Sequence, residues 1–376
     1  MNETMNICIS PPQGFSEIGQ KSNQEDSLYP LLGQADARQR VFLLCDGMGG
    51  HAHGEVVSRC VADAVGTWVE QQLSAKAKED DASASLCTMQ QMEQFFTEGL
   101  SRAYAELDQL DNESAADGSS RSTMGTTLTF LAICADGMLV AHIGDSRIYQ
   151  LRLGSGVVFQ TCDHSLVNEL LLAGEITEEE ARTHPRRNVI TRAVQPHQEE
   201  PSRPTFDRLT DIRRGDVFLL CCDGVTEQLS NADLEHLLLT TDSLAERIDA
   251  LRSLCAERHT RDNHTCWAFE VEQVEKSEQE EQSAVETPSS QVAQGKEKPQ
   301  TQVQDNPCQP TTTHYYWVWF LLVLLALAGF VAGYFYTQGT SSHKAEIAPS
   351  VSTQVDTMDS VSDSGIQGTL KRAKRR

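Results

Sequence analysis

Basic residues are scarce in this chain of 376 residues, where 31 Lys and Arg stand against 54 Asp and Glu. The formal net charge is −23 at pH 7. A nucleic-acid-binding protein needs a basic surface that meets the phosphates, so this balance argues against that class. Most of the carboxylates are expected on the solvated surface, although their abundance is also compatible with the binding of divalent cations.

Cysteines at Cys-x-x-Cys spacing are absent, and the total of eleven cysteines is odd. Several lie inside apolar runs, where a reduced thiol packs as a small hydrophobic group: Cys45, Cys134, Cys221 and Cys266. The first residues also lack a basic segment followed by an apolar one, so we expect no secretory signal peptide. Together these features predict that the chain begins in the cytosol.

Two familiar catalytic motifs are missing as well. The glycine-rich stretch GMGGH lacks the Gly-Lys-Ser/Thr that completes a P-loop, and no Gly-x-Ser-x-Gly nucleophile elbow occurs. His51 and His53 are a weak candidate for a zinc pair, because two histidines alone rarely form a zinc site.

Changes in composition divide the chain into four parts. Apolar runs, glycine turns and amphipathic segments alternate from about residue 13, which predicts one folded domain within residues 1–272. Residues 273–313 are rich in Glu, Gln, Ser, Thr and Pro. Such a segment cannot bury enough apolar surface to fold, so we expect a disordered linker. A long apolar run and a polar tail at 337–376, with a basic end, follow the linker.

The apolar run from Tyr315 to Tyr336 contains no charged residue. As a helix it would rise about 33 Å, enough to cross the roughly 30 Å hydrocarbon layer of a membrane, and tyrosines and tryptophans mark its ends. We therefore predict a single-pass membrane protein. Lys296 and Lys298 precede the run while only Lys344 follows it closely, a weak bias that places the domain in the cytoplasm and the tail outside.

Short apolar runs separated by Asp-Gly or other glycine turns predict strands that form antiparallel hairpins. The predicted strands are residues 41–45, 126–134, 138–143, 148–153, 157–161, 217–222 and 263–272. Apolar residues at helical spacing predict helices at 55–73, 89–110 and 231–257, and residues 163–192 are expected to be helical and polar. Within the last segment, Thr177 and Glu180 form a capping-box pattern, and Pro185 ends the helix. This order predicts an α+β fold of antiparallel sheets covered by helices.

Acidic residues recur at the ends of the predicted strands and at tight turns. They are Glu25 and Asp26 in NQED, Asp46 in CDGMGGH, Asp145 in GDSR, Asp223 in CCDG and Asp262 in RDNHT. Each one alone is best explained as a turn residue, because Asp-Gly is a common turn. Together they suggest a ligand site, because a strand end fixes a carboxylate and a following glycine lets the backbone approach a ligand.

A metal centre is the chemistry that such a group of carboxylates favours. Carboxylate and carbonyl oxygens are the ligands that Mg²⁺ and Mn²⁺ prefer. The Asp-Gly ends at Asp46 and Asp223 are expected in adjacent strands, from which they would hold two ions from opposite sides. Two such ions about 3.5–4 Å apart bind a bridging water and lower its pKa, which suits phosphoryl transfer to water.

Seven motifs between residues 13 and 272 resemble, in sequence and in order, those of bacterial type 2C metal-dependent protein Ser/Thr phosphatases. They are KSNQED, VFLLCDGMGGHAHGE, TMGTTL, AHIGDSRIY, DHSLVNELLLAGEITEEEARTHPRRNVITRAV, LLCCDGVTEQL and RDNHT. The resemblance implies the family fold, a pair of antiparallel β-sheets sandwiched between pairs of helices. It also implies hydrolysis of phosphoserine and phosphothreonine in proteins by a water that bridges two metal ions.

The resemblance assigns the main metal ligands. Asp46 matches the aspartate that bridges two Mn²⁺ or Mg²⁺ ions, and Gly47 matches the glycine whose carbonyl binds one of them. Asp223 and Asp262 match the carboxylates of the second half of the site. On this basis Asp46 and Asp223 are also expected to be essential for catalysis.

Further positions match the family in the surroundings of the metal pair. Glu25 and Asp26 match an acidic pair that holds metal-bound waters. Asp145 matches an aspartate linked to a third, weaker metal. Residues 164–192 match a flap that overhangs the cleft and influences the choice of substrate.

Three positions depart from the family pattern. Lys21 stands where an arginine usually binds the phosphate, and its point charge cannot form a bidentate contact. It is still expected to act in catalysis, because with the metals it offsets the charge of the phosphoryl group. Met48 stands where eukaryotic members have a histidine proposed as general acid. Glu227 stands where an aspartate is often found, which puts the third metal in doubt.

Phosphorylated Ser/Thr proteins are the implied substrates, and a eukaryotic-type Ser/Thr kinase is an expected partner; we expect the chain to be a monomer. Two alternatives remain open from the sequence. One is a catalytically impaired, membrane-anchored sensor that binds phosphoproteins, and the other is a phosphatase of a partner-switching regulator. The retained carboxylates argue against the sensor, because clustered buried charge destabilises a fold and a domain without catalysis has no need of it.

Overall fold

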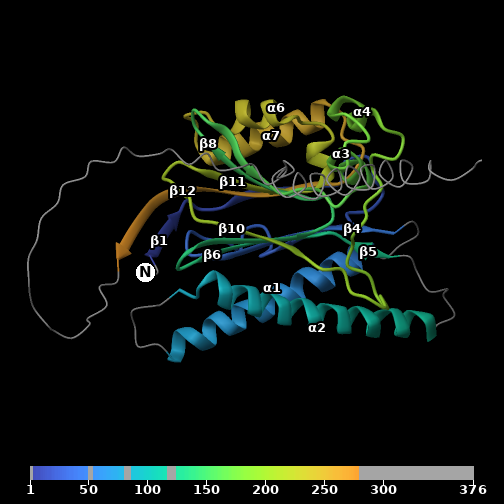
Figure 1. The fold of residues 1–376 in the computed structure, drawn as a ribbon, viewed down its shortest axis with the longest axis horizontal. Coiled ribbons are helices and arrows are strands. Elements are labelled where there is room, and N and C mark those ends of the chain that lie inside the picture. The colour runs from blue at the N-terminus through green and yellow to red at the C-terminus, as the bar shows by residue number, and fades with distance from the viewer. Residues whose placement is uncertain (1–2, 50–53, 80–85, 117–123, 279–376) are drawn as a thin grey trace, which may run out of the picture. The chain divides into compact units, whose positions relative to one another are not determined.

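The computed structural model describes residues 3–49, 54–79, 86–116 and 124–278 (Figure 1). All of them belong to the first of two compact units into which the chain divides, Met1–Pro310. The predicted membrane segment at 315–336, most of the predicted linker and the tail at 337–376 lie outside the described residues. Among the helices that the structure describes, none is long and apolar enough to cross a membrane.

Two antiparallel sheets form the centre of this unit. The first has the strand order β1-β12-β11-β8-β9, with β2 also paired to β12. Its strands are β1 (Glu3–Ile9), β2 (Gln13–Glu17), β8 (Arg147–Arg152), β9 (Gly156–Gln160), β11 (Val217–Cys221) and β12 (His264–Glu278). The second has the order β10-β7-β6-β4-β3, with β5 paired to β4. Its strands are β3 (Asp26–Tyr29), β4 (Val41–Met48), β5 (Gly125–Thr126), β6 (Leu128–Cys134), β7 (Gly137–Ile143) and β10 (Thr205–Leu209).

Helices cover the outer face of each sheet, and the layers are seen edge-on in Figure 1. The helices α1 (Gly54–Glu79) and α2 (Met89–Ala116) lie under the second sheet, while α6 (Asn231–Leu238) and α7 (Leu244–Glu257) lie over the first. Two short helices, α3 (Leu166–Leu172) and α4 (Glu178–Thr183), lie at one end of the sheets, and α5 (Asp223–Thr226) directly follows β11. The predicted pair of antiparallel sheets between helix layers is confirmed.

Strand β4 shows why the apolar run before Asp46 is continuous. Its side chains point alternately to the two faces of the sheet. Phe42 and Leu44 enter the core shared with the first sheet, and Leu43 and Cys45 enter the core under α1 and α2. All four are fully buried. Because both faces are covered, the strand needs no polar residue and gives rigid support to the residue at its end.

The edges of the domain differ from the prediction. The sequence-based prediction lacks β1, which pairs with the last part of β12, from Glu3 opposite Glu278 to Ile7 opposite Val274. The predicted boundary after residue 272 is therefore too early, because β12 continues to Glu278. Residues 273–276 are mostly exposed and polar, so their composition is that of a linker although they form an edge of the sheet.

Shorter elements account for the other differences. The strands β2, β3 and β10 are absent from the sequence-based prediction. The segment 163–192 is helical only in α3 and α4, and the capping box of Thr177 and Glu180 is confirmed at the start of α4. The helical segment 231–257 divides into α6 and α7. The remaining predicted strands and the helices α1 and α2 are confirmed, with ends that differ by several residues.

Candidate metal centre

Asp46 is held at the end of β4 by its own backbone. The peptide N–H of Asp46 donates to Thr127 Oγ1 at 3.0 Å, and its carbonyl accepts from Thr127 N and Thr126 Oγ1, both at 2.9 Å. In the register of the sheet, Asp46 lies directly opposite Asp26 of β3. The two carboxylates are therefore fixed beside each other by the pairing of two strands. Neither threonine was identified by the sequence analysis, because their roles depend on this pairing.

The Asp26 side chain is only 6% exposed, and both of its carboxylate oxygens are buried without a hydrogen-bond partner among the described residues. A buried carboxylate without partners is costly unless a cation or proton compensates it. Burial is the largest cause that raises the pKa of Asp26, to about 6. Asp26 thus has two buried carboxylate oxygens without a hydrogen-bond partner in the described chain.

Asp223 reaches the centre from the other sheet. It is the first residue of α5 and directly follows the N-cap Cys222 at the end of β11. One of its carboxylate oxygens is also buried without a partner in the described part of the chain. The prediction that Asp46 and Asp223 end adjacent strands is wrong, because β4 and β11 belong to different sheets. The centre therefore lies between the ends of two facing sheets.

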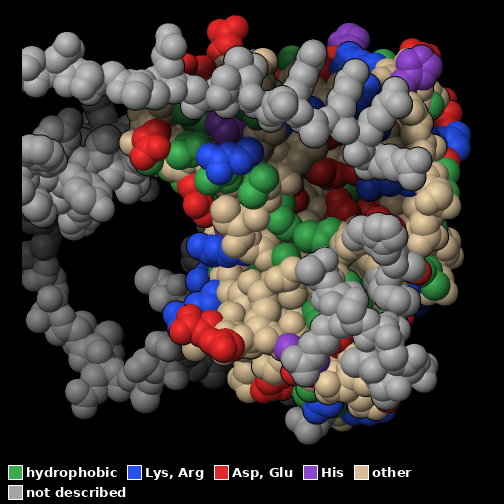
Figure 2. Space-filling model, turned by 90° about the vertical axis from the view of Figure 1, so that its right-hand side faces the viewer, with side chains coloured by type: hydrophobic (Ala, Val, Ile, Leu, Met, Phe, Trp, Pro, Cys, Tyr) green, Lys and Arg blue, Asp and Glu red, His purple; other side chains and the backbone are tan. Residues whose placement is uncertain are grey.

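The carboxylates are close enough to disfavour one another's charge. Burial is the largest cause that raises the pKa values of Asp46 and Asp223 well above their usual range. Negative charges on neighbouring carboxylates raise them further: Asp26, Asp145, Asp262 and Glu227. The pKa of Asp145 is raised to about 7, first by burial and then by the charge of Asp163. The structure thus gathers the predicted aspartates, and Figure 2 shows acidic side chains in a recess of the face at this end of the sheets.

Lys21 is the basic residue of the centre. Its Nζ lies 2.8 Å from Asp262 Oδ1 and 4.0 Å from Glu25 Oε2. Burial lowers the pKa of Lys21, but the hydrogen bond and the charge of Asp262 raise it more, so the net pKa is above the usual value. The side chain is 43% exposed, so Lys21 lies where the centre meets solvent.

Asn263 joins the Glu25 loop and the Asp262 loop. Its Oδ1 accepts from Glu25 N at 2.8 Å, and its Nδ2 donates to the carbonyls of Ile18 and Asn23, both at 2.9 Å. Its own N–H donates to Asp262 Oδ1 at 2.8 Å. In the sequence Asn263 has only the appearance of a turn residue.

Gly47 has a structural requirement of its own. A Cβ atom at this position would lie 2.3 Å from Gly54 O and 2.6 Å from Glu25 O, so a side chain cannot be accommodated. The N–H of Gly47 donates to Glu25 O at 3.1 Å. The glycine thus allows the start of α1 and the Glu25 loop to approach β4. Glu55, also at the start of α1, has a buried carboxylate oxygen without a partner in the described chain. Burial is the largest cause that raises the pKa of Glu25, and the charge of Glu55 raises it further.

The predicted flap is tied to the turn that carries Asp145. His164 N donates to Gly144 O at 2.9 Å, and Gly144 N donates to His164 Nδ1 at 3.2 Å. The His164 ring stacks on His142, with 4.5 Å between ring centroids. Burial lowers the pKa of His164 to about 3, so this link is made by a neutral imidazole. The guanidinium of Arg147 also contacts Asp163, at 2.7 and 2.6 Å.

The donor set fits hard divalent cations. The predicted ligands are carboxylate oxygens and the carbonyl of Gly47, and three of the buried aspartate oxygens have no partner in the described residues. Positive charge at this point would satisfy those oxygens and remove the mutual repulsion. Mg²⁺ and Mn²⁺ prefer such ligands. The weak zinc candidates His51 and His53 lie outside the described residues.

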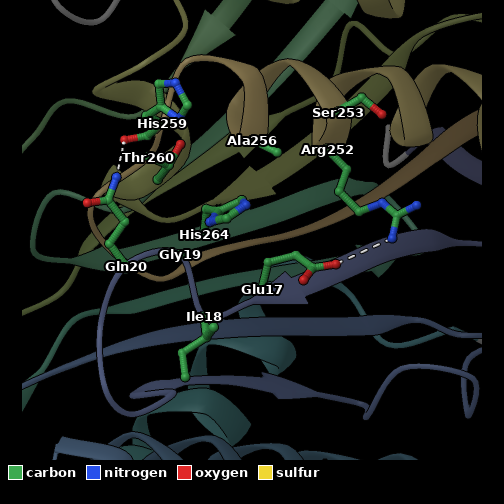
Figure 3. A pocket seen from close by; sticks show the side chains of 10 residues that line it. All are labelled: Glu17, Ile18, Gly19, Gln20, Arg252, Ser253, Ala256, His259, Thr260 and His264. Carbon is green, nitrogen blue, oxygen red and sulfur yellow. Dashed lines mark hydrogen bonds and ion pairs between the residues drawn. The ribbon is translucent and has the colours of Figure 1, made fainter.

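A pocket of about 400 Å³ lies beside the centre and not at it. Its walls, which Figure 3 shows, come from the end of β2, the turn that follows, the end of α7 and the start of β12. None of the predicted site residues lines it. The backbone of the pocket nevertheless packs against the backbone of the metal centre. A Cβ atom on Gly19, which lines the pocket, would lie 2.1 Å from the carbonyl oxygen of Asp262.

Comparison with known proteins identifies the family of the fold. The family model of protein phosphatase 2C matches residues 13–262. The chain is similar to protein phosphatase PhpP of Streptococcus pneumoniae, with 33% identity over 239 residues that cover 63% of this chain and 87% of the relative. It is also similar to the crystal structure of the serine/threonine phosphatase PstP/Ppp of Mycobacterium tuberculosis. The TM-score is 0.54 and the identity 31%, over 72% of this chain and 100% of that one.

A second solved structure is the catalytic domain of the serine/threonine protein phosphatase PstP in complex with two manganese ions. Its TM-score is 0.51 and its identity 29%, over 72% of this chain and 100% of that one. Since the family model covers more than half of the chain, the chain belongs to the protein phosphatase 2C family.

Proposed function

We propose that this chain is a metal-dependent protein phosphatase that hydrolyses phosphoserine and phosphothreonine. The observation that carries the proposal is the cluster of buried and partly buried carboxylates between the ends of β4 and β11, three of whose buried aspartate oxygens have no partner in the described residues. Family membership and the manganese-bound relative support the same conclusion. A phosphate ester brings further negative charge to this place, so cations are needed there before a substrate can bind.

Asp46, Asp223 and Asp262, with the carbonyl of Gly47, are the groups that would hold two Mn²⁺ or Mg²⁺ ions. When bound, such a pair supplies a water nucleophile at neutral pH and offsets the charge of the phosphoryl group. Glu25 and Asp26 would orient waters around the pair, and we assign no phosphoenzyme to the reaction. The backbone contacts of Asp46 with Thr126 and Thr127 fix its carboxylate in advance of the reaction.

Lys21 is the chain's own group for the phosphoryl oxygens. In this structure its ammonium is paired with Asp262, and a divalent cation that binds Asp262 would compete for that carboxylate. The ammonium would then be free to donate to a phosphoryl oxygen beside the metal pair. Asp145 and Glu227 lie together with Asp223, and we assign them to a third, weaker metal position.

The direct test is turnover of phosphothreonine and phosphoserine peptides by the full chain with Mn²⁺, with Mg²⁺ and after treatment with EDTA. We expect release of phosphate to fall by at least about a hundredfold in EDTA and to return with Mn²⁺. Turnover that is indifferent to EDTA would exclude the metal-dependent mechanism.

Lys21→Ala should raise the KM for the peptide more than it lowers kcat, and Lys21→Arg should restore binding.

We also propose that residues 315–336 anchor the chain in a membrane as a single span, with the phosphatase domain on the cytoplasmic side. The uncharged run and its aromatic ends support this. A membrane-bound Ser/Thr kinase would then meet its phosphatase at raised effective concentration. Removal of 315–336 should release the chain from the membrane fraction of cell lysates; a truncated chain that still sediments with membranes would refute the anchor.

A further inference from the structure

Cys222 places a sulfur atom among the carboxylates of the centre. It is the residue between β11 and α5, and its side chain is fully buried. One ligand atom each from Cys222, Asp26 and Asp46 lies within 4.8 Å of the other two. In the sequence Cys222 is only the last residue of the predicted strand 217–222. The proposed phosphatase reaction gives it no role.

The sulfur is hydrogen-bonded in a way that is compatible with a thiolate. Thr265 N donates to Cys222 Sγ at 3.2 Å, and Cys222 Sγ donates to Asn263 O at 3.4 Å. Only the second contact needs the thiol proton. A backbone N–H that points at sulfur favours the charged form. The sulfur can therefore lose its proton to a metal ion and keep one of its two contacts.

The carboxylate of Asp26 is a second, independent indication that a cation binds here. Its carboxylate is more than nine-tenths buried, and neither oxygen has a hydrogen-bond partner in the described residues. Zinc binds thiolate sulfur at about 2.3 Å and carboxylate oxygen at about 2.0–2.2 Å. Ligand atoms around one such ion are roughly 3–4 Å apart, so small side-chain movements bring these three atoms to one ion.

We propose that Cys222, Asp26 and Asp46 form a site for a thiophilic divalent cation of the Zn²⁺ class, with water in the remaining position. When the metal–sulfur bond forms, the thiol proton leaves to solvent and no atom is oxidised or reduced. Soft thiolate ligands select Zn²⁺ over Mg²⁺ and Mn²⁺. The site shares Asp46 with the proposed phosphatase centre, so on that proposed function Zn²⁺ competes with Mn²⁺ and stops turnover.

The ligand set distinguishes metals by the preference of each metal for sulfur. A hard cation such as Mg²⁺ or Mn²⁺ gains little from sulfur, so with such a cation on the carboxylates Cys222 remains a packed side chain.

The test uses Co²⁺ as a spectroscopic substitute for Zn²⁺ in the metal-free full chain. We expect wild type to show a thiolate-to-cobalt charge-transfer band in the near ultraviolet, and Zn²⁺ to abolish it by displacement. In Cys222→Ser the band should disappear and the affinity for Zn²⁺ should fall at least about tenfold. Serine can make both contacts of the cysteine, with Thr265 N and Asn263 O, so this variant is expected to fold. Cys60→Ser, which removes a cysteine of α1 that contacts Glu106, is the matched control and should keep the band.

Two outcomes would overturn the site: a wild-type chain without the charge-transfer band, or a band and Zn²⁺ affinity that are unchanged in Cys222→Ser. Inhibition of Mn²⁺-dependent turnover by Zn²⁺ is a second, independent test of the site. Zn²⁺ should inhibit wild type at concentrations at least about tenfold lower than Cys222→Ser. Equal inhibition of both would also overturn the role of the sulfur. The cobalt band does not need turnover, so failure of the proposed phosphatase activity is distinguishable from failure of this site.

Discussion

Asp46→Asn is expected to lower Mn²⁺-dependent hydrolysis of a phosphothreonine peptide by about a thousandfold or more, or roughly 4 kcal/mol of transition-state stabilisation. The amide that replaces the carboxylate has the same size but carries no charge and only one acceptor oxygen. It would therefore not bridge two cations. Steady-state kinetics at saturating Mn²⁺, with the metal content of each protein measured, would show whether the loss of turnover accompanies loss of metal.

The same variant separates loss of chemistry from loss of fold. The contacts that hold residue 46 in place are made by its backbone with Thr126 and Thr127, and Asp46→Asn leaves them intact. In EDTA the variant should be at least as stable as wild type, because one of several repelling carboxylates is gone. Asp36→Asn is a control, since Asp36 is an exposed residue paired with Arg38. Activity of Asp46→Asn within tenfold of wild type would remove Asp46 from the metal pair.

The local part of the centre follows from the sequence. An apolar run that ends in Asp-Gly predicts a buried strand with a carboxylate at its end, and β4 with Asp46 and β11 with Asp223 both have this form. Strand, turn and side-chain direction are set within a few residues, so a local pattern is sufficient to predict them. The resemblance to a family supplied the pairing of sheets, which periodicity alone does not contain.

The contacts between distant segments do not follow from the sequence. Two strand ends look alike whether the strands are neighbours in one sheet or face each other in two, which is why the predicted adjacency of Asp46 and Asp223 is wrong. Asn263 shows the same limit. It connects the Glu25 loop to the Asp262 loop, although more than two hundred residues separate Asn263 from Glu25. Such a residue has no local signal beyond its preference for turns.

Removal of divalent metal is expected to make the stability of the chain fall as the pH rises from about 4 to about 7. The folded-state pKa of Asp26 is about 6, against 3.8 for an unperturbed carboxyl. The folded chain therefore binds this proton more tightly than the unfolded chain. The stability that it contributes is complete below the unfolded pKa and is lost as the pH rises through about 6. A difference of about two pKa units corresponds to roughly 3 kcal/mol, and the raised pKa values of Asp46, Asp145 and Asp223 act in the same direction.

Urea unfolding in EDTA at several pH values would measure this loss in wild type, in Asp26→Asn and in the surface control Asp36→Asn. We expect Asp26→Asn to lose less stability with rising pH than the other two, because the carboxyl that binds the proton is gone. Saturating Mn²⁺ should reverse the trend in wild type, since the metal binds the deprotonated carboxylates and its stabilisation grows as protons leave them. Parallel pH profiles for wild type and Asp26→Asn would contradict the raised pKa. The unpartnered oxygens of Asp26 would then have to be satisfied by water instead of by protons or cations.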